Sequence, residues 1–136
     1  MTKKIDLKKY TDFVEGVTSK ASSDMNTFVD SMKRVQENGI NAPLFLVAAM
    51  GMSGETGEFS EIAKKVVFHG KEITPELHLH LQKELGDVIW YWTNACRALG
   101  VDPNEIIANN VSKLEARYPG GKFDAWHSDN RKDGDI

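Results

Sequence analysis

The chain has 136 residues, of which 40% are hydrophobic and 27% are charged, and its formal net charge is −3 at pH 7. This length suits one domain with a core of its own and is too short for two ordinary domains. The acidic balance argues against a general binder of nucleic acids or anionic membranes. The longest apolar run, residues 43–52, is too short to span a bilayer, and the N-terminal residues MTKKIDLKKY hold no apolar run of signal-peptide length. We therefore expect a cytoplasmic protein with neither nucleic acid nor membrane as a partner.

Hydrophobic residues recur at intervals of three and four along most of the chain, which is typical of amphipathic helices. Helix-start residues such as Asn, Thr and Asp stand before Pro43, Pro75 and Pro103, and glycines follow the expected ends. No segment alternates as a strand does. The sequence predicts an all-α helical bundle of about five helices. Their expected ranges are 7–17, 23–38 with its cap at Ser22 or Ser23, 42–69, 75–99 and 103–118.

The domain organisation expected from this pattern is a single domain over residues 1–136. Its core spans about 22–118, and residues 122–136 form a polar C-terminal tail with Phe123 and Trp126 as candidate anchors. The end of the tail is expected to be mobile or docked on a partner subunit.

Two acidic couplets stand out, Glu55 with Glu58 and Glu84 with Asp87. Each has i,i+3 spacing, so each places two carboxylates on one face of a helix. Both couplets lie in apolar sequence, where four carboxylates facing a shared interior would repel one another. Hard divalent cations are the usual solution, and Mg²⁺ prefers such oxygen ligands. Two antiparallel helices joined by a turn of about six residues can bring the couplets together.

The alternative is that these acids lie on ordinary solvated helix faces, where acidic pairs are common. Gly54 and Gly57 lower helix propensity beside the first couplet, but they also let a ligand approach closely. A di-iron bundle would need Glu-x-x-His, and no histidine follows a glutamate by three residues. The sequence therefore disfavours a transition-metal site, and we expect the histidines at the surface.

A basic pair, Lys113 and Arg117, lies four residues apart on one predicted helix face, one turn after Asn110. These residues could bind phosphate, with lysine as a point charge and arginine as a bidentate fork. Spacing alone slightly favours a solvated basic face or an ion pair with a neighbour such as Glu115. Tyr91 is the middle one of three successive aromatic residues on the predicted helix, and a role in the core is open for it.

Residues 54–59 read GETGEF, residues 84–88 read ELGDV and residues 110–119 read NVSKLEARYP. Together they resemble the ExxE…ExxD signature and the downstream Asn-x-x-Lys-Leu-x-x-Arg-Tyr-Pro segment of the MazG-type all-α nucleoside triphosphate pyrophosphohydrolases. The resemblance covers about residues 43–124. In its single-domain length the chain is similar to the short phage-encoded and bacterial members.

The resemblance implies hydrolysis of a nucleoside triphosphate, with deoxynucleotides favoured, to the monophosphate and pyrophosphate. It implies Mg²⁺, for which Mn²⁺ can substitute, with two or more ions per site. It also implies a homo-oligomer, either a dimer or a tetramer built as a dimer of dimers. The expected metal ligands are Glu55, Glu58, Glu84 and Asp87, with Glu55 or Glu58 as the catalytic group that orients water. The expected substrate-binding residues are Tyr91, Asn110, Lys113 and Arg117.

Two other functions stay open at this point. One is a narrow-specificity dUTP or dCTP (di)phosphatase on the same scaffold. The other is a non-catalytic helical module that binds metal or nucleotide without turnover.

Overall fold

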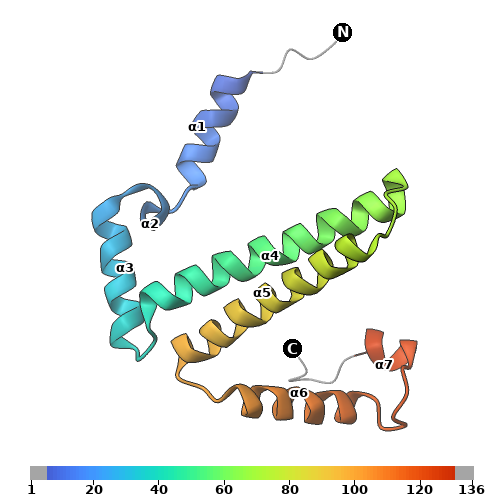
Figure 1. The fold of residues 1–136 in the computed structure, drawn as a ribbon. Helices are drawn as coiled ribbons and strands as arrows, with labels where there is room; N and C mark the ends of the chain where they lie inside the picture. Colours follow the sequence, from blue (N-terminus) through green and yellow to red (C-terminus); the bar gives the residue numbers. More distant parts are fainter. Residues whose placement is uncertain (1–5, 131–136) are drawn as a thin grey trace.

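The computed structural model describes residues 6–130, and these residues form helices and no strands (Figure 1). The all-α fold class expected from the sequence is confirmed. The helices are α1 (Leu7–Val17), α2 (Lys20–Ser23), α3 (Met25–Glu37), α4 (Ala42–His69), α5 (Pro75–Leu99), α6 (Pro103–Arg117) and α7 (Ala125–Asp129).

The short helices α2 and α7 add to the five that the sequence predicted. The prediction that Ser22 or Ser23 caps the second long helix was wrong, because both residues belong to α2. Asp24 caps α3 instead, and its carboxylate accepts a hydrogen bond from the backbone N–H of Thr27 at 2.8 Å. Asp124 caps α7 in the same way, inside the tail that was expected to be polar. The expectation for the end of the tail lies outside the described residues from 131 onward.

Helices α4 and α5 form a long antiparallel hairpin whose ends follow local capping rules. Asn41 and Thr74 cap the two helix starts, each accepting a hydrogen bond from a backbone N–H three residues later. Gly70 and Gly100 end the helices with φ of 66° and 67°, a left-handed conformation that disfavours residues with a Cβ. The backbone N–H of Asn41 donates to the carbonyl of Ala98 at 2.9 Å, which fastens the start of α4 to the end of α5.

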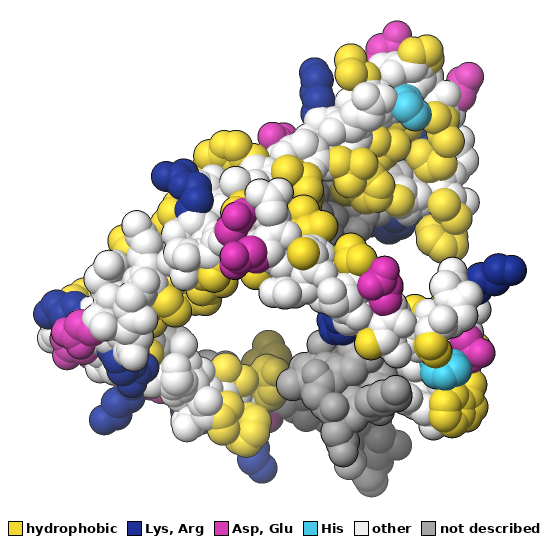
Figure 2. All heavy atoms as spheres, turned by 90° about the horizontal axis from the view of Figure 1, so that it is seen from below, with side chains coloured by type: hydrophobic (Ala, Val, Ile, Leu, Met, Phe, Trp, Pro, Cys, Tyr) yellow, Lys and Arg dark blue, Asp and Glu magenta, His cyan; other side chains and the backbone are white. Residues whose placement is uncertain are grey.

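The buried side chains of the described residues are mostly small. They are Ala42, Ala48, Ile62, Leu77, Cys96 and Ala98, together with the polar residues Glu84 and Asn94. Many large apolar side chains are exposed, and Figure 2 shows them spread over one face, with an opening left between the helices. The surface area is 11175 Å², whereas a compact monomer of this mass exposes about 7,100 Å². The chain therefore has an extended surface and a thin core.

Extensive helix packing is confined to the α4–α5 hairpin, with smaller contacts of α3 with α2 and with α4. Helix α6 runs apart from the hairpin, beyond the end of α5 (Figure 1). Among the described residues, no helix is both long enough and apolar enough to cross a membrane. The hairpin is thus the rigid element on which a site can be built.

Candidate metal centre

Three of the four couplet carboxylates meet in the middle of the hairpin. Glu55 and Glu58 on α4 and Glu84 on α5 each offer one oxygen, and these oxygens lie within 4.8 Å of one another. We call these three residues the acidic trio. The i,i+3 spacing puts the two α4 carboxylates on the face that meets α5. Glu84 is buried, Glu55 is half-buried and Glu58 is exposed, so the cluster runs from the helix interface to solvent.

Electrostatics in the trio act most clearly on Glu55. Desolvation raises the pKa of its carboxyl group above 4.5, and the charges of Glu58 and Asp87 raise it further. A hydrogen bond with Glu84 and the charge of Glu84 act in the same direction. Asp87 is exposed and does not belong to the trio, although its charge acts on the pKa of Glu55 in the same direction as that of Glu58. Without a cation, the cluster favours a proton on Glu55.

The acidic trio fits a hard divalent cation. All of its donors are carboxylate oxygens, which Mg²⁺ prefers. In an octahedral shell with bonds near 2.1 Å, oxygens lie about 3.0 Å apart when adjacent and about 4.2 Å apart when opposite. The separations in the trio need only small side-chain adjustments to reach these values. A cation there would also offset the repulsion that raises the pKa of Glu55.

A cavity of about 340 Å³ opens beside the trio. Its lining consists of small, charged and apolar side chains from both helices: Gly54, Gly57, Glu58, Glu61, Ile62, Lys65 and His80. A Cβ at Gly54 or Gly57 would meet no other atom, so the α4 backbone is open to an approaching ligand, as the sequence suggested. The cavity thus brings a ligand next to the carboxylates.

The walls of this cavity also carry positive charge. Lys64 and Lys65 both pair with Glu61, and the Lys65 Nζ lies 3.4 Å from its carboxylate. These pairs lower the pKa of Glu61, with the hydrogen bond from Lys64 as the main cause. Lys65 is half-buried and lines the cavity together with Glu58. An anionic group that entered the cavity would therefore find a lysine close to the acids.

Tyr91 packs inside the hairpin. A Cβ at Gly51 would overlap the Tyr91 ring, so glycine at that position allows the ring to lie directly against the α4 backbone. The same ring meets Trp90 edge-on, with a centroid distance of 4.8 Å. Tyr91 is half-buried, and its contact with a nucleoside stays a prediction.

The geometry of the hairpin agrees with comparisons with known proteins. A family model described as the MazG nucleotide pyrophosphohydrolase domain matches residues 47–121, more than half of the chain. The chain belongs to the MazG nucleotide pyrophosphohydrolase family. It is 37% identical over 84 residues to the Gene 37 protein of Mycobacterium phage L5, covering 60% of this chain and 72% of that protein. No solved structure matches the chain.

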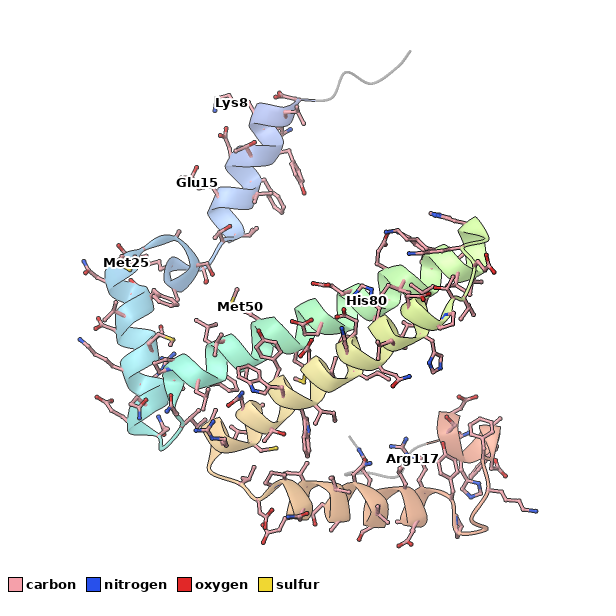
Figure 3. The ribbon with its side chains drawn as sticks, viewed as in Figure 1. Lys8, Glu15, Met25, Met50, His80 and Arg117 are labelled. Atoms are coloured by element: carbon pink, nitrogen blue, oxygen red, sulfur yellow. The ribbon has the colours of Figure 1, made fainter. Side chains whose placement is uncertain are left out.

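The MazG match includes the acidic trio and all of α6, which carries Asn110, Lys113 and Arg117. Figure 3 shows His80 on the hairpin and Arg117 on α6, at separate places in the chain. The described part of one chain does not pack α6 against the trio. The phosphate-binding role of these three residues therefore stays a prediction.

Sequence reasoning missed two groups at the candidate site. His80 lies at the surface as expected, with its side chain 53% exposed, but its contact with Glu84 was not predicted: His80 Nε2 lies 2.7 Å from Glu84 Oε1. Sequence reasoning also gave Glu61 no role, although Glu61 pairs with both lysines near the cavity. The i,i+4 spacing of His80 and Glu84 was the signal that could have found the first group. The i,i+4 spacing of Glu61 and Lys65 was the signal that could have found the second group.

In the metal-free protein, we expect Glu55 to contribute stability that is lost as the pH rises from about 4.5 through its raised pKa. A raised carboxyl pKa means that the folded state binds the proton more tightly than the unfolded state does. The stabilisation is therefore fully present at pH values below 4.5 and is lost above the folded pKa. Urea unfolding in EDTA across this pH range measures the effect.

The matched variant for this measurement is Glu55→Gln. It removes the titrating group and leaves Glu58, Glu84, Asp87 and His80 in place. Its unfolding free energy should fall less steeply with pH than that of the wild type. Parallel pH profiles for the two proteins would contradict the prediction.

Proposed function

We propose that this protein is a metal-dependent nucleotide pyrophosphohydrolase that converts nucleoside triphosphates, deoxynucleotides preferentially, to monophosphates and pyrophosphate. The observation that carries the proposal is the acidic trio, closed from two helices within a MazG domain and open to a cavity. A triphosphate carries nearly four negative charges and could not approach these carboxylates unaided. Cations between the two resolve the repulsion.

The residues that would hold the cations are Glu55, Glu58, Glu84 and Asp87. Two or more Mg²⁺ ions, or Mn²⁺ in their place, suit a set of donors that are all oxygens. When bound, such ions would neutralise phosphate charge and lower the pKa of a water, which could then attack the α-phosphorus. The bond from the α-phosphorus to the oxygen of the β-phosphate then breaks, and pyrophosphate leaves.

Glu55 or Glu58 is the proposed catalytic carboxylate that orients the attacking water. Both lie on α4 beside the cavity, and Glu58 lines it directly. Orientation of the water in line with the leaving oxygen is a positional task that a carboxylate on a rigid helix can perform.

Substrate binding is assigned to Tyr91 for the nucleoside and to Asn110, Lys113 and Arg117 for the phosphates. Lysine and arginine suit this task because they attract phosphate as a point charge and as a bidentate fork. Lys113 and Arg117 both interact with other residues. A bound phosphate would take the place of these interactions or be added to them.

The proposed assembly is a homo-oligomer, either a dimer or a tetramer built as a dimer of dimers. Its support is the surface of 11175 Å², which exceeds the compact-monomer value by about 4,000 Å². Obligate interfaces bury areas of about 2,000–5,000 Å² and are hydrophobic. The exposed apolar side chains of the hairpin, including Leu85, Ile89 and Trp90, suit such an interface.

A panel of all ribonucleoside and deoxyribonucleoside triphosphates, assayed for pyrophosphate release with Mg²⁺ or Mn²⁺, tests the proposal. We expect release from several deoxynucleotides, and none in EDTA. Glu58→Ala and Asp87→Ala should abolish it while circular dichroism shows the helices intact.

Other outcomes of the panel separate the alternatives. Activity confined to dUTP or dCTP would indicate a narrow-specificity enzyme on this scaffold. If no nucleotide released pyrophosphate, the protein would be a binding module and not an enzyme.

A further inference from the structure

Two histidines of α5, His78 and His80, lie two residues apart and therefore on different faces of the helix. Each contacts the residue four positions later. His78 Nδ1 lies 2.8 Å from the side-chain nitrogen of Gln82, whereas His80 Nε2 lies 2.7 Å from Glu84 Oε1. The two contacts have the same spacing, but only the second reaches the acidic trio. His78 can therefore serve as an internal control for His80.

Glu84 is the member of the trio that most needs a fixed partner. Its side chain is only 7% exposed, and a buried carboxylate is costly unless it is hydrogen-bonded. The His80 side chain is 53% exposed, so its ring spans from solvent to the buried carboxylate. An N–H at Nε2 can donate to Oε1 and fix the rotation of the carboxylate group.

His80 also lines the cavity beside the trio, together with Glu58 and Lys65. It therefore contacts both the cavity and Glu84. An oxygen of the same carboxylate belongs to the acidic trio, so a hydrogen bond to Oε1 can fix how the Glu84 carboxylate faces the other two acids. Hydrogen bonds of this kind orient metal ligands and strengthen metal binding.

We infer that His80 is a positioning residue, which orients the Glu84 carboxylate and thereby raises the affinity of the acidic trio for a divalent cation. The inference rests on the proposed metal site and adds to it a residue outside the acidic couplets. In this role His80 acts through the Glu84 carboxylate, which its Nε2 contacts, and is not itself a ligand.

Titration of the full-length protein with Mn²⁺ alone, without nucleotide, tests the inference by calorimetry. His80→Ala should weaken Mn²⁺ binding about 10- to 100-fold, the usual effect of losing a residue that supports a metal ligand. His80→Gln should recover part of the loss, because its amide can donate to a glutamate one turn later. The control His78→Ala removes a histidine of the same helix and should bind as the wild type does. Alanine is a good helix former, so both alanine variants should keep the fold.

Three results would overturn the inference. The first is an unchanged dissociation constant for His80→Ala. The second is nitrogen hyperfine coupling to bound Mn²⁺ in the wild type that His80→Ala removes, because it would make His80 a ligand. The third is an equal loss in His78→Ala. If the wild type bound no Mn²⁺, the proposed metal site would fall together with the inference, whereas a failure limited to the His80 variants leaves that site standing.

Discussion

Glu84→Gln should reduce metal-dependent pyrophosphate release by about a thousandfold, equivalent to about 4 kcal/mol in the activation barrier. The amide keeps the shape of the side chain but removes the charge that would hold a cation. Glu84 is buried and lies within 4.8 Å of both other members of the trio, so a neighbour cannot easily replace it. Pyrophosphate release at saturating Mg²⁺ measures the effect.

Stability should change in the opposite direction. Removal of one of several crowded negative charges should leave the metal-free Glu84→Gln protein at least as stable as the wild type. Addition of Mg²⁺ should raise the melting temperature of the wild type and have little effect on the variant. Glu15→Gln, on exposed α1, is the charge-matched control and should keep wild-type activity. If Glu84→Gln turned over substrate as fast as the wild type does, Glu84 would not be a ligand in the proposed metal site.

Gly51→Ala should destabilise the protein by about 1–3 kcal/mol, the usual cost of overpacking. The added methyl group would overlap the Tyr91 ring, which is held between the two helices. Gly54→Ala, one turn later on α4, makes the same substitution in open space. It should instead gain up to about 1 kcal/mol from helix propensity. Urea unfolding of the two variants measures this contrast in sign.

The Tyr91→Ala background identifies the cause. Without the ring, Gly51→Ala should no longer destabilise and should behave as Gly54→Ala does, giving a coupling energy of about 1–4 kcal/mol. If Gly51→Ala cost the same with and without the ring, the close packing of Tyr91 on α4 would not be the reason for glycine at this position.

Local sequence signals were enough to predict the hairpin and its acids. Asn41 and Thr74 cap the helix starts, and Gly70 and Gly100 end the helices, so the ranges of α4 and α5 follow from neighbouring residues. Once the helices are fixed, i,i+3 spacing puts each couplet on one face. The trio of Glu55, Glu58 and Glu84 can then be predicted with little information beyond the sequence.

Features that depend on competition between neighbouring capping residues, or on packing between helices, were harder to predict. Ser22, Ser23 and Asp24 are all good caps, and the sequence did not show that Asp24 starts α3. His78 and His80 have equivalent i,i+4 partners, and only the packing of α4 on α5 makes the second contact part of a site. Helix α6 runs apart from the hairpin, and its residues carry no local signal for its direction.

The short connection between α4 and α5 affects the order in which the protein folds. Only residues 70–74 separate the helices, and Glu55 and Glu84 are 29 positions apart. Contacts of such low sequence separation close quickly, because the entropy lost on loop closure is small. The hairpin can therefore form early in folding, before the rest of the chain has found its place. A divalent cation captured at that stage would hold the two helices together while the remaining helices fold.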